Sequence, residues 1–411
     1  MSSNEYEWFL GIDWGSEKHR FCLMDGSGKV LEEKWIEHSG KALAEMVDWL
    51  GRHTGDVPGD LAVGIETPRG ALVETLIERG FAVFSINPKQ MDRFRDRCSS
   101  AGAKDDRRDA LVLADSLRTD RHCFHAVRIA PAEIIRLREL SRLEDTLVGE
   151  HNRLTNQLWE QLHRYFPGLL QLCGGADEPW LWELLEKATL PAQAAKLSAG
   201  QIGEILSRHR IRRLDGAAVK EVLGRQPLRL AAGAAEAASE HVLLLLPRLR
   251  LVHRQRDEIV QRIQRLLEEL AAPEAEEGRK HRDAAIILSL PGVGRKTGAT
   301  MLSEASQALA ERDYHALRCL GGAAPVTRRS GKKKVVMMRY GCNERLREAF
   351  YHWSLNSIRC EERARQQYAE KKARGKTHGC ALRGVVDRQL AVLVSMLRYN
   401  TLYDAQRRAP A

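Results

Sequence analysis

The sequence predicts an α/β domain at residues 1–125, a long helical arm at 126–273 and a mostly helical C-terminal domain at 284–411. Three observations support this division. The first 120 residues alternate short apolar runs with helical patterns, which is typical of an α/β domain. Leucines then recur at three-, four- and seven-residue steps from about 131 to 167, which predicts one long helix. From 284 onward the pattern is helical, apart from Gly-rich and Lys-rich loops.

The first domain is predicted to contain a hairpin followed by alternating helices and strands. Apolar runs predict strands at 7–13, 60–67 and 81–88, two strands joined by a tight turn within 19–37, and helices at 40–53 and 70–80. A right-handed crossover from the hairpin returns the fourth strand parallel to the first. This order favours an RNase H-like fold, and a doubly wound nucleotide-binding domain is the alternative.

The helical arm is expected to consist of two long helices. The first ends before Pro167, and the second covers 248–270. Two such helices of opposite direction pair like a coiled coil, either within one chain or between chains. The segment 168–240 is rich in Ala and Leu and helical in pattern, and 274–283 reads as the linker into the last domain.

Composition narrows the class of protein. The net charge is +10 over 411 residues, which favours a polyanionic partner such as nucleic acid. The sequence contains no run of 18 apolar residues, so it predicts no membrane span, and no signal peptide is visible at the N-terminus. Eight cysteines lie scattered without a CxxC pair, which indicates reduced thiols in the cytoplasm rather than disulfides or a zinc site.

Four acids are predicted to converge. Asp13 and Glu66 each end a strand, and adjacent strands bring them to one sheet edge. Asp106 and Asp109 are spaced i, i+3, so they share one helix face. Carboxylates so close need cations, and two Mg²⁺ ions roughly 4 Å apart would neutralise them and clamp a phosphodiester. We call these four residues the acid tetrad.

Simpler explanations exist for each acid. Asp105 points about 100° away from Asp106 and suits a solvated or helix-starting position. An aspartate at a strand end often forms a turn, and acids often sit at helix N-termini. The neighbouring Arg107 and Arg108 are also available to balance the charge. An actin-like sugar kinase opens with a similar Gly-Ile-Asp strand, but no convincing Gly-rich adenosine-binding loop follows.

The C-terminal domain holds two phosphate-binding candidates. The first is "LPGVGRKT" at 290–297, where Gly292 and Gly294 permit close backbone approach and Lys296 starts a helix. It resembles a helix-hairpin-helix element, which grips DNA backbone without reading sequence. The alternative is a plain Gly-rich link between core helices.

The second candidate is the basic stretch around Ser330 at 321–341. The surrounding cations are Arg328, Arg329, Lys332, Lys333 and Lys334. A serine hydroxyl needs a base, a metal or nearby positive charge to act as a nucleophile, and cations stabilise a phosphoryl group under attack. No histidine lies within ten residues of Ser330. Taken alone, the stretch also fits a solvated basic loop.

The ordered motifs "GIDWG", "GIET", "KDDRRDA", "LPGVGRKT" and "GGAAPVTRRSG" resemble one family. It comprises the insertion-sequence transposases with an N-terminal DEDD, RuvC-like domain and a C-terminal serine-carrying domain, also called bridge-RNA-guided recombinases and related to Piv invertases. The resemblance covers residues 8–118 and 285–400. This chain differs from the family pattern in having Asp105 where threonine is usual and three lysines after the serine loop.

The resemblance implies a function. The acid tetrad would bind Mg²⁺, and Ser330 would attack DNA to form a covalent 5′-phosphoserine linkage. A non-coding bridge RNA would pair with donor and target DNA, and the protein would assemble as dimers and tetramers with composite sites. The alternatives are a metal-dependent structure-specific nuclease, such as a junction resolvase, and a non-catalytic nucleic-acid-binding protein.

Overall fold

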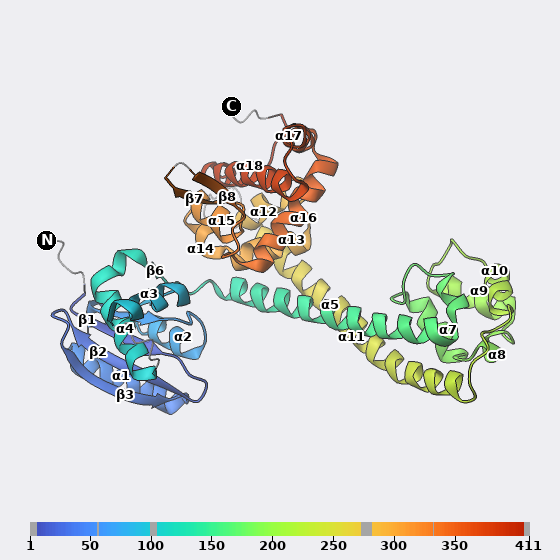
Figure 1. Cartoon of the computed structure of the whole chain (residues 1–411), viewed down its shortest axis with the longest axis horizontal. Coiled ribbons are helices and arrows are strands. Elements are labelled where there is room, and N and C mark those ends of the chain that lie inside the picture. The colour runs from blue at the N-terminus through green and yellow to red at the C-terminus, as the bar shows by residue number, and fades with distance from the viewer. Residues whose placement is uncertain (1–5, 56, 99–104, 273–281, 332, 407–411) are drawn as a thin grey trace. The chain divides into compact units, whose positions relative to one another are not determined.

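A computed structural model describes residues 6–55, 57–98, 105–272, 282–331 and 333–406. The chain divides into two compact units, residues 1–130 and 131–411, and each is described by itself (Figure 1). No described helix is both long enough and apolar enough to cross a membrane.

The first unit is built on a mixed six-stranded sheet in the order β3-β2-β1-β4-β5-β6. The strands are β1 (Trp8–Asp13), β2 (Lys18–Asp25), β3 (Val30–Glu37), β4 (Leu61–Ile65), β5 (Ala82–Ser85) and β6 (His125–Ala126). β1, β4 and β5 run parallel. β2 pairs antiparallel with β1, and β3 pairs antiparallel with β2. This confirms the predicted α/β class, and the order fits the RNase H-like prediction. The two-residue β6, antiparallel to β5, was not predicted.

Helices cover both faces of the sheet. They are α1 (Gly40–Thr54), α2 (Ala71–Glu78), α3 (Pro88–Cys98) and α4 (Asp106–Asp120). Neighbouring residues of β1 point to opposite faces, as the pleat requires. Leu10 packs in a cluster with Met46 of α1, whereas Phe9 packs in a second cluster with Leu113 of α4.

The second unit begins with two long helices that lie side by side, α5 (Ala132–Tyr165) and α11 (Ala234–Ala271) (Figure 1). The first matches its prediction. The second starts fourteen residues before the expected 248 and contains Pro247. A proline inside a helix costs roughly 3 kcal/mol. Val242, Leu245 and Leu246 are at most 1% exposed, and their burial favours continuing the helix through the proline.

The segment between these helices is helical, as predicted. It contains α6 (Pro167–Leu170), α7 (Pro179–Lys187), α8 (Pro191–Ala194), α9 (Ala199–Arg208) and α10 (Gly216–Leu223). Trp180 and Trp182 of α7 are buried and share one core with α5 and α11.

The C-terminal region is mostly helical, as predicted, but one of its expected loops contains two strands. Its helices are α12 (Asp283–Leu288), α13 (Arg295–Glu304), α14 (Ser306–Ala310), α15 (Tyr314–Leu320), α16 (Glu344–Cys360), α17 (Glu362–Ala373) and α18 (His378–Tyr399). The expected Lys-rich loop is an antiparallel hairpin of β7 (Val326–Ser330) and β8 (Lys333–Met337). Its β-branched residues favour extended backbone, and Gly331 adopts φ +55° in the turn. Most of the linker expected at 274–283 lies outside the described residues.

Candidate active site

Asp13 is the last residue of β1, and Glu66 directly follows β4. Both acids therefore lie at the carboxyl ends of two neighbouring parallel strands. The parallel pairing of β1 with β4 matches Ile12 with Ile65, so the next residue on each strand is an acid. Both acids are partly buried. The sequence-based argument for neighbouring strands therefore holds for these two positions.

Two glycines let α4 approach this part of the sheet. Gly11 of β1 pairs with Gly64 of β4. A Cβ atom on Gly11 would lie 1.9 Å from the carbonyl oxygen of Ala110, and one on Gly64 would lie 3.1 Å from that of Leu113. Any larger side chain at Gly11 would therefore push α4 away from the sheet.

The direction of α4 decides where its acids lie. Its C-terminal part approaches the β2–β3 turn, where a Cβ atom on Gly28 would lie 3.2 Å from the guanidinium carbon of Arg118. That turn adjoins the start of β1, whereas Ala110 lies against the middle of the strand. The helix thus runs antiparallel to β1. Its first turn, with Asp106 and Asp109, is placed toward the edge that carries the other two acids.

The three aspartates at the start of α4 have different surroundings. Asp105 is the exposed N-cap, and its carboxylate accepts a hydrogen bond of 3.0 Å from the backbone N–H of Arg108. Asp106 is exposed. Asp109 is only 2% exposed. The capping role agrees with the expectation that Asp105 starts the helix and leaves Asp106 and Asp109 as the pair on one face.

The charge of Asp109 is balanced by a residue that the sequence did not single out. Arg95 of α3 donates two hydrogen bonds to the Asp109 carboxylate, from Nε at 2.6 Å and from Nη2 at 3.0 Å. It also bonds Asp92 at 2.6 Å. The hydrogen bond to Asp109 raises the pKa of Arg95, and the charge of Glu66 contributes to the rise. Only tertiary packing reveals this role, because fourteen residues separate Arg95 from Asp109.

The donor set of the acid tetrad suits Mg²⁺. All four side chains offer carboxylate oxygens, the ligands that this cation prefers. Among the described residues, the one group whose three ligand atoms lie within 4.8 Å of one another is elsewhere, at Asp120, His122 and Cys123. Asp120 is already bonded by Arg97 at 2.9 Å. The acid tetrad does not form such a group among the described residues, and its Asp109 is paired with Arg95.

In the second unit, the Pro-Gly-Val-Gly turn leads into α13. Gly292 has φ +80°, and a Cβ atom there would lie 2.7 Å from the backbone nitrogen of Ser357 in α16. Gly294 is the N-cap and has open space around it. The half-exposed Lys296 pairs with Asp145 of α5 at 2.8 Å, and Arg295 pairs with Glu144 at 2.6 Å. The turn is fixed against α16 and its cations are partly neutralised.

A cavity of about 450 Å³ opens at this turn. Its lining combines the first turn of α13 with one face of α16 and includes Lys296, Thr297, Arg345, His352 and Asn356. Backbone N–H groups at the start of a helix and cationic side chains both favour an anion. The lining also includes the acids Asp145 and Glu348, and Asp145 pairs with both Lys296 and Arg345, so the positive charge of the cavity is partly neutralised.

Ser330 ends β7 at the tip of the hairpin. Arg328, Arg329, Lys333 and Lys334 are all exposed. In the parts of the chain that the structure describes, none of these four cations forms an ion pair. Lys332, also predicted to bind nucleic acid, lies outside the described residues. The hairpin thus presents a hydroxyl among uncompensated positive charges.

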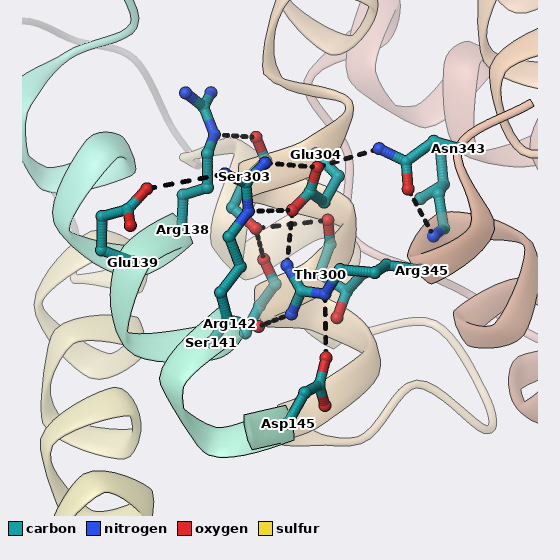
Figure 2. A network of polar contacts seen from close by, with 12 residues as sticks. Arg138, Glu139, Ser141, Arg142, Asp145, Thr300, Ser303, Glu304, Asn343 and Arg345 are labelled. Atoms are coloured by element: carbon teal, nitrogen blue, oxygen red, sulfur yellow. Dashed lines mark hydrogen bonds and ion pairs between the residues drawn. The ribbon is translucent and has the colours of Figure 1, made fainter. Parts of the chain in front are cut away.

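The segment that follows the hairpin is held by a half-buried ionic network (Figure 2). We call the following residues the anchor network: Arg142, Asp145, Glu304, Asn343 and Arg345. Glu304 of α13 accepts hydrogen bonds from Arg142 at 3.0 Å, from the Asn343 amide at 2.9 Å and from Arg345. Arg345 also donates to Asp145 at 2.8 Å. These contacts join α5, α13 and the start of α16.

The network keeps its acids ionised. Burial alone would raise the pKa of Glu304, but hydrogen bonds from Arg142 and Asn343 and the nearby guanidinium charges outweigh it and lower the pKa. The same balance, with Lys296 and Arg345 as donors, lowers the pKa of Asp145. Paired charges of this kind fix geometry, because removing one partner leaves a buried charge.

Both units contain a segment that matches a known transposase family. Residues 10–167 match the DEDD transposase model of IS110, and residues 284–369 match the model of the IS116/IS110/IS902 transposase family. The mini-circle putative transposase for IS117 of Streptomyces coelicolor is 31% identical over 407 residues, which cover 97% of this chain and 96% of that protein. The chain belongs to this transposase family. DNA transposition is therefore its class of activity.

Other relatives agree with this assignment. The transposase is 50% identical to the putative transposase y4uE of Sinorhizobium fredii over 208 residues, which span 50% of this chain and 58% of that protein. It is 27% identical to the uncharacterized 42 kDa protein of insertion element IS900 from Mycobacterium paratuberculosis, over 96% of both chains.

Proposed function

We propose that this transposase cleaves and rejoins DNA strands with Ser330 as nucleophile and the acid tetrad as the ligands of one or two Mg²⁺ ions. The observation that carries the proposal is the placement of α4. It runs antiparallel to β1 and directs Asp106 and Asp109 toward the sheet edge that carries Asp13 and Glu66. We assign the first unit to the RuvC-like group of RNase H-like folds on the same ground.

The reaction divides between the two units. The Oγ of Ser330 forms a bond to the phosphorus, the bond from phosphorus to the 3′ oxygen breaks, and the 5′ end stays attached as phosphoserine. The serine loses its proton, and the released 3′ oxygen gains one. Bound Mg²⁺ would neutralise the phosphodiester oxygens. The arginines and lysines of the hairpin hold the neighbouring phosphates, since none is engaged by an acid among the described residues.

The turn at 291–294 supplies a second grip on the nucleic acid backbone. We assign it a helix-hairpin-helix-like role, with Gly292 and Gly294 giving access to the backbone and Lys296 as the cation. The cavity at the start of α13 supports this role. Such contacts position DNA without reading its sequence.

We also propose an RNA partner and a homo-oligomer. The family resemblance implies a bridge RNA, and a net charge of +10 supports binding of polyanions through counterion release. Exposed apolar residues on the paired helices, Leu143, Leu244 and Leu251, support contact of this arm with a second copy. The site of action would be DNA in the bacterial cytoplasm. RNA that co-purifies with the protein, and loss of site-specific cleavage after RNase treatment, would support the RNA assignment.

Strand-transfer assays with matched variants test the function. Ser330→Ala is expected to abolish strand exchange and any covalent protein–DNA adduct while leaving DNA and RNA binding. Asp13→Asn is expected to abolish cleavage at every Mg²⁺ concentration. Cleavage without an adduct in Ser330→Ala would instead identify a metal-dependent nuclease. Unchanged activity in Asp13→Asn would indicate that the acids only support the fold.

A further inference from the structure

The register of the hairpin sets a lysine directly opposite the proposed nucleophile. Ser330 of β7 pairs with Lys333 of β8 in the antiparallel ladder, next to the turn. Directly opposed residues have Cβ atoms about 4.5–5.5 Å apart and project from the same face. A lysine side chain is long enough to span that separation, so its amine can reach the serine hydroxyl without any change in the backbone.

The other cations of the hairpin differ in their placement. Side chains alternate between the two faces of a strand pair. Arg329 and Lys334, which also pair in the ladder, therefore lie on the face opposite to Ser330. Arg328 shares the face of Ser330 but is paired with Val335. Lys333 is thus the described cation that lies directly opposite Ser330 in the strand pair. Lys334 carries the same charge but lies on the other face of the hairpin.

We propose that Lys333 is the general base for Ser330, an inference that rests on the proposed function. The neutral amine accepts the hydroxyl proton as Oγ bonds to phosphorus, and it becomes an ammonium ion. The bond from phosphorus to the 3′ oxygen breaks, and that oxygen takes a proton from water. Serine–lysine pairs act as nucleophile and base in other folds, and no histidine lies within ten residues of Ser330 to take this role.

The described surroundings of Lys333 on the hairpin are basic. β8 packs on β7, which carries Arg328 and Arg329, and β8 itself carries Lys334. Among the described residues, no carboxylate pairs with any of these cations. The same cluster then stabilises the charge that develops on the phosphoryl oxygens.

Three substitutions in the full-length protein, assembled with its DNA and RNA, test this assignment. Lys333→Gln and Lys334→Gln each remove one charge from the hairpin and should weaken DNA binding to a similar degree. Lys333→Arg keeps the positive charge but removes the proton acceptor, because a guanidinium group does not give up its proton. The readout is the single-turnover rate of covalent adduct formation with all of the DNA bound, measured as a function of pH.

The base assignment predicts that both Lys333 variants lose about 100-fold or more in adduct rate, whereas Lys334→Gln loses only a few-fold. The wild-type rate should rise with pH until the amine is fully neutral, and Lys333→Gln should lack this rise. Full activity in Lys333→Arg, or equal losses in Lys333→Gln and Lys334→Gln, would overturn it. Adduct formation that persists in Ser330→Ala would instead overturn the proposed function.

Discussion

The acid tetrad and the proposed nucleophile are held in opposite ways. Asp109 is buried, its helix touches β1 through a glycine, and its carboxylate is bonded by Arg95. Ser330 lies on an exposed hairpin whose support is indirect, through the anchor network behind it. The difference shows that the proposed metal ligands and the proposed nucleophile need different surroundings. Several acids hold a cation only in fixed geometry, whereas a serine that attacks a large polymer must be accessible.

The two regions also balance charge differently. In the first unit, a single arginine neutralises Asp109, and in the second unit the anchor network neutralises Glu304. On the hairpin, Arg328, Arg329 and Lys333 have no acidic partner within the described residues. Charge left uncompensated on a surface is available to phosphates. Four pairs of substitutions probe this contrast, from the largest expected effect to the smallest.

The largest effect is expected at the contact between β1 and α4. Gly11→Ala would set a Cβ atom 1.9 Å from the carbonyl oxygen of Ala110, so the helix or the strand must move. We expect a loss of about 3 kcal/mol or more in the free energy of unfolding, measured by urea denaturation. Gly149→Ala is the control, because that exposed helical glycine has open space around it. It should stabilise by roughly 0.5–1 kcal/mol. Equal effects of the two changes would contradict the close contact.

The pairing of Arg95 with Asp109 is the next test. Arg95→Gln leaves a buried carboxylate beside Glu66 and should destabilise the metal-free protein by about 3 kcal/mol. Mg²⁺ should raise the melting temperature of this variant more than that of the wild type, because the cation replaces the lost positive charge. Arg97→Gln, on a more exposed side chain, is the matched control and should cost under about 1 kcal/mol. A variant that gains nothing from Mg²⁺ would argue against metal binding near Asp109.

The anchor network predicts a pH-dependent contribution to stability. The pKa of Glu304 is lowered in the folded protein, so its contribution is present above the unfolded pKa of about 4.3 and is lost as pH falls through the folded pKa. Glu304→Gln should cost about 3 kcal/mol at neutral pH. The difference from wild type should vanish in strong acid. Glu139→Gln, an exposed partner of Arg142, should change little at any pH. A difference between Glu304→Gln and wild type that is independent of pH would refute the ionic role.

The smallest effect separates Asp105 from the tetrad. Asp105→Ala removes the N-cap of α4 and should cost about 1 kcal/mol of stability. Strand transfer should continue, because the side chain caps the helix rather than holding metal. Asp106→Asn should abolish strand transfer with little change in stability. If Asp105→Ala were inactive and Asp106→Asn active, the two residues would exchange roles.

Much of the first unit follows from local pattern. The apolar runs gave the order of the first five strands, and the i, i+3 spacing gave the shared face of Asp106 and Asp109. β6 was not predicted because a strand of two residues shows no periodicity in the sequence. Its extended backbone is stabilised by pairing with β5. Arg95 escaped because nothing in a charged helix indicates which arginine faces a buried acid.

The C-terminal hairpin was missed for a different reason. Strands that are exposed on both faces lack the alternation of apolar and polar residues that marks a half-buried strand. Lysines and arginines in β7 and β8 therefore looked like a loop. The predicted start of α11 at 248 was also too late. The helix continues through Pro247, a local helix breaker, because the leucines before it are buried.

One measurement tests most directly the proposal that Ser330 attacks DNA while the acid tetrad binds Mg²⁺. Wild-type protein is reacted with donor DNA and Mg²⁺, the DNA is digested by nuclease, and peptides that retain a nucleotide are sequenced by mass spectrometry. We predict a single modified residue, Ser330, with attachment lost when Mg²⁺ is omitted or when Asp109 is replaced by Asn. Attachment at any other side chain, or rejoined DNA without a nucleotide-bearing peptide, would contradict the account.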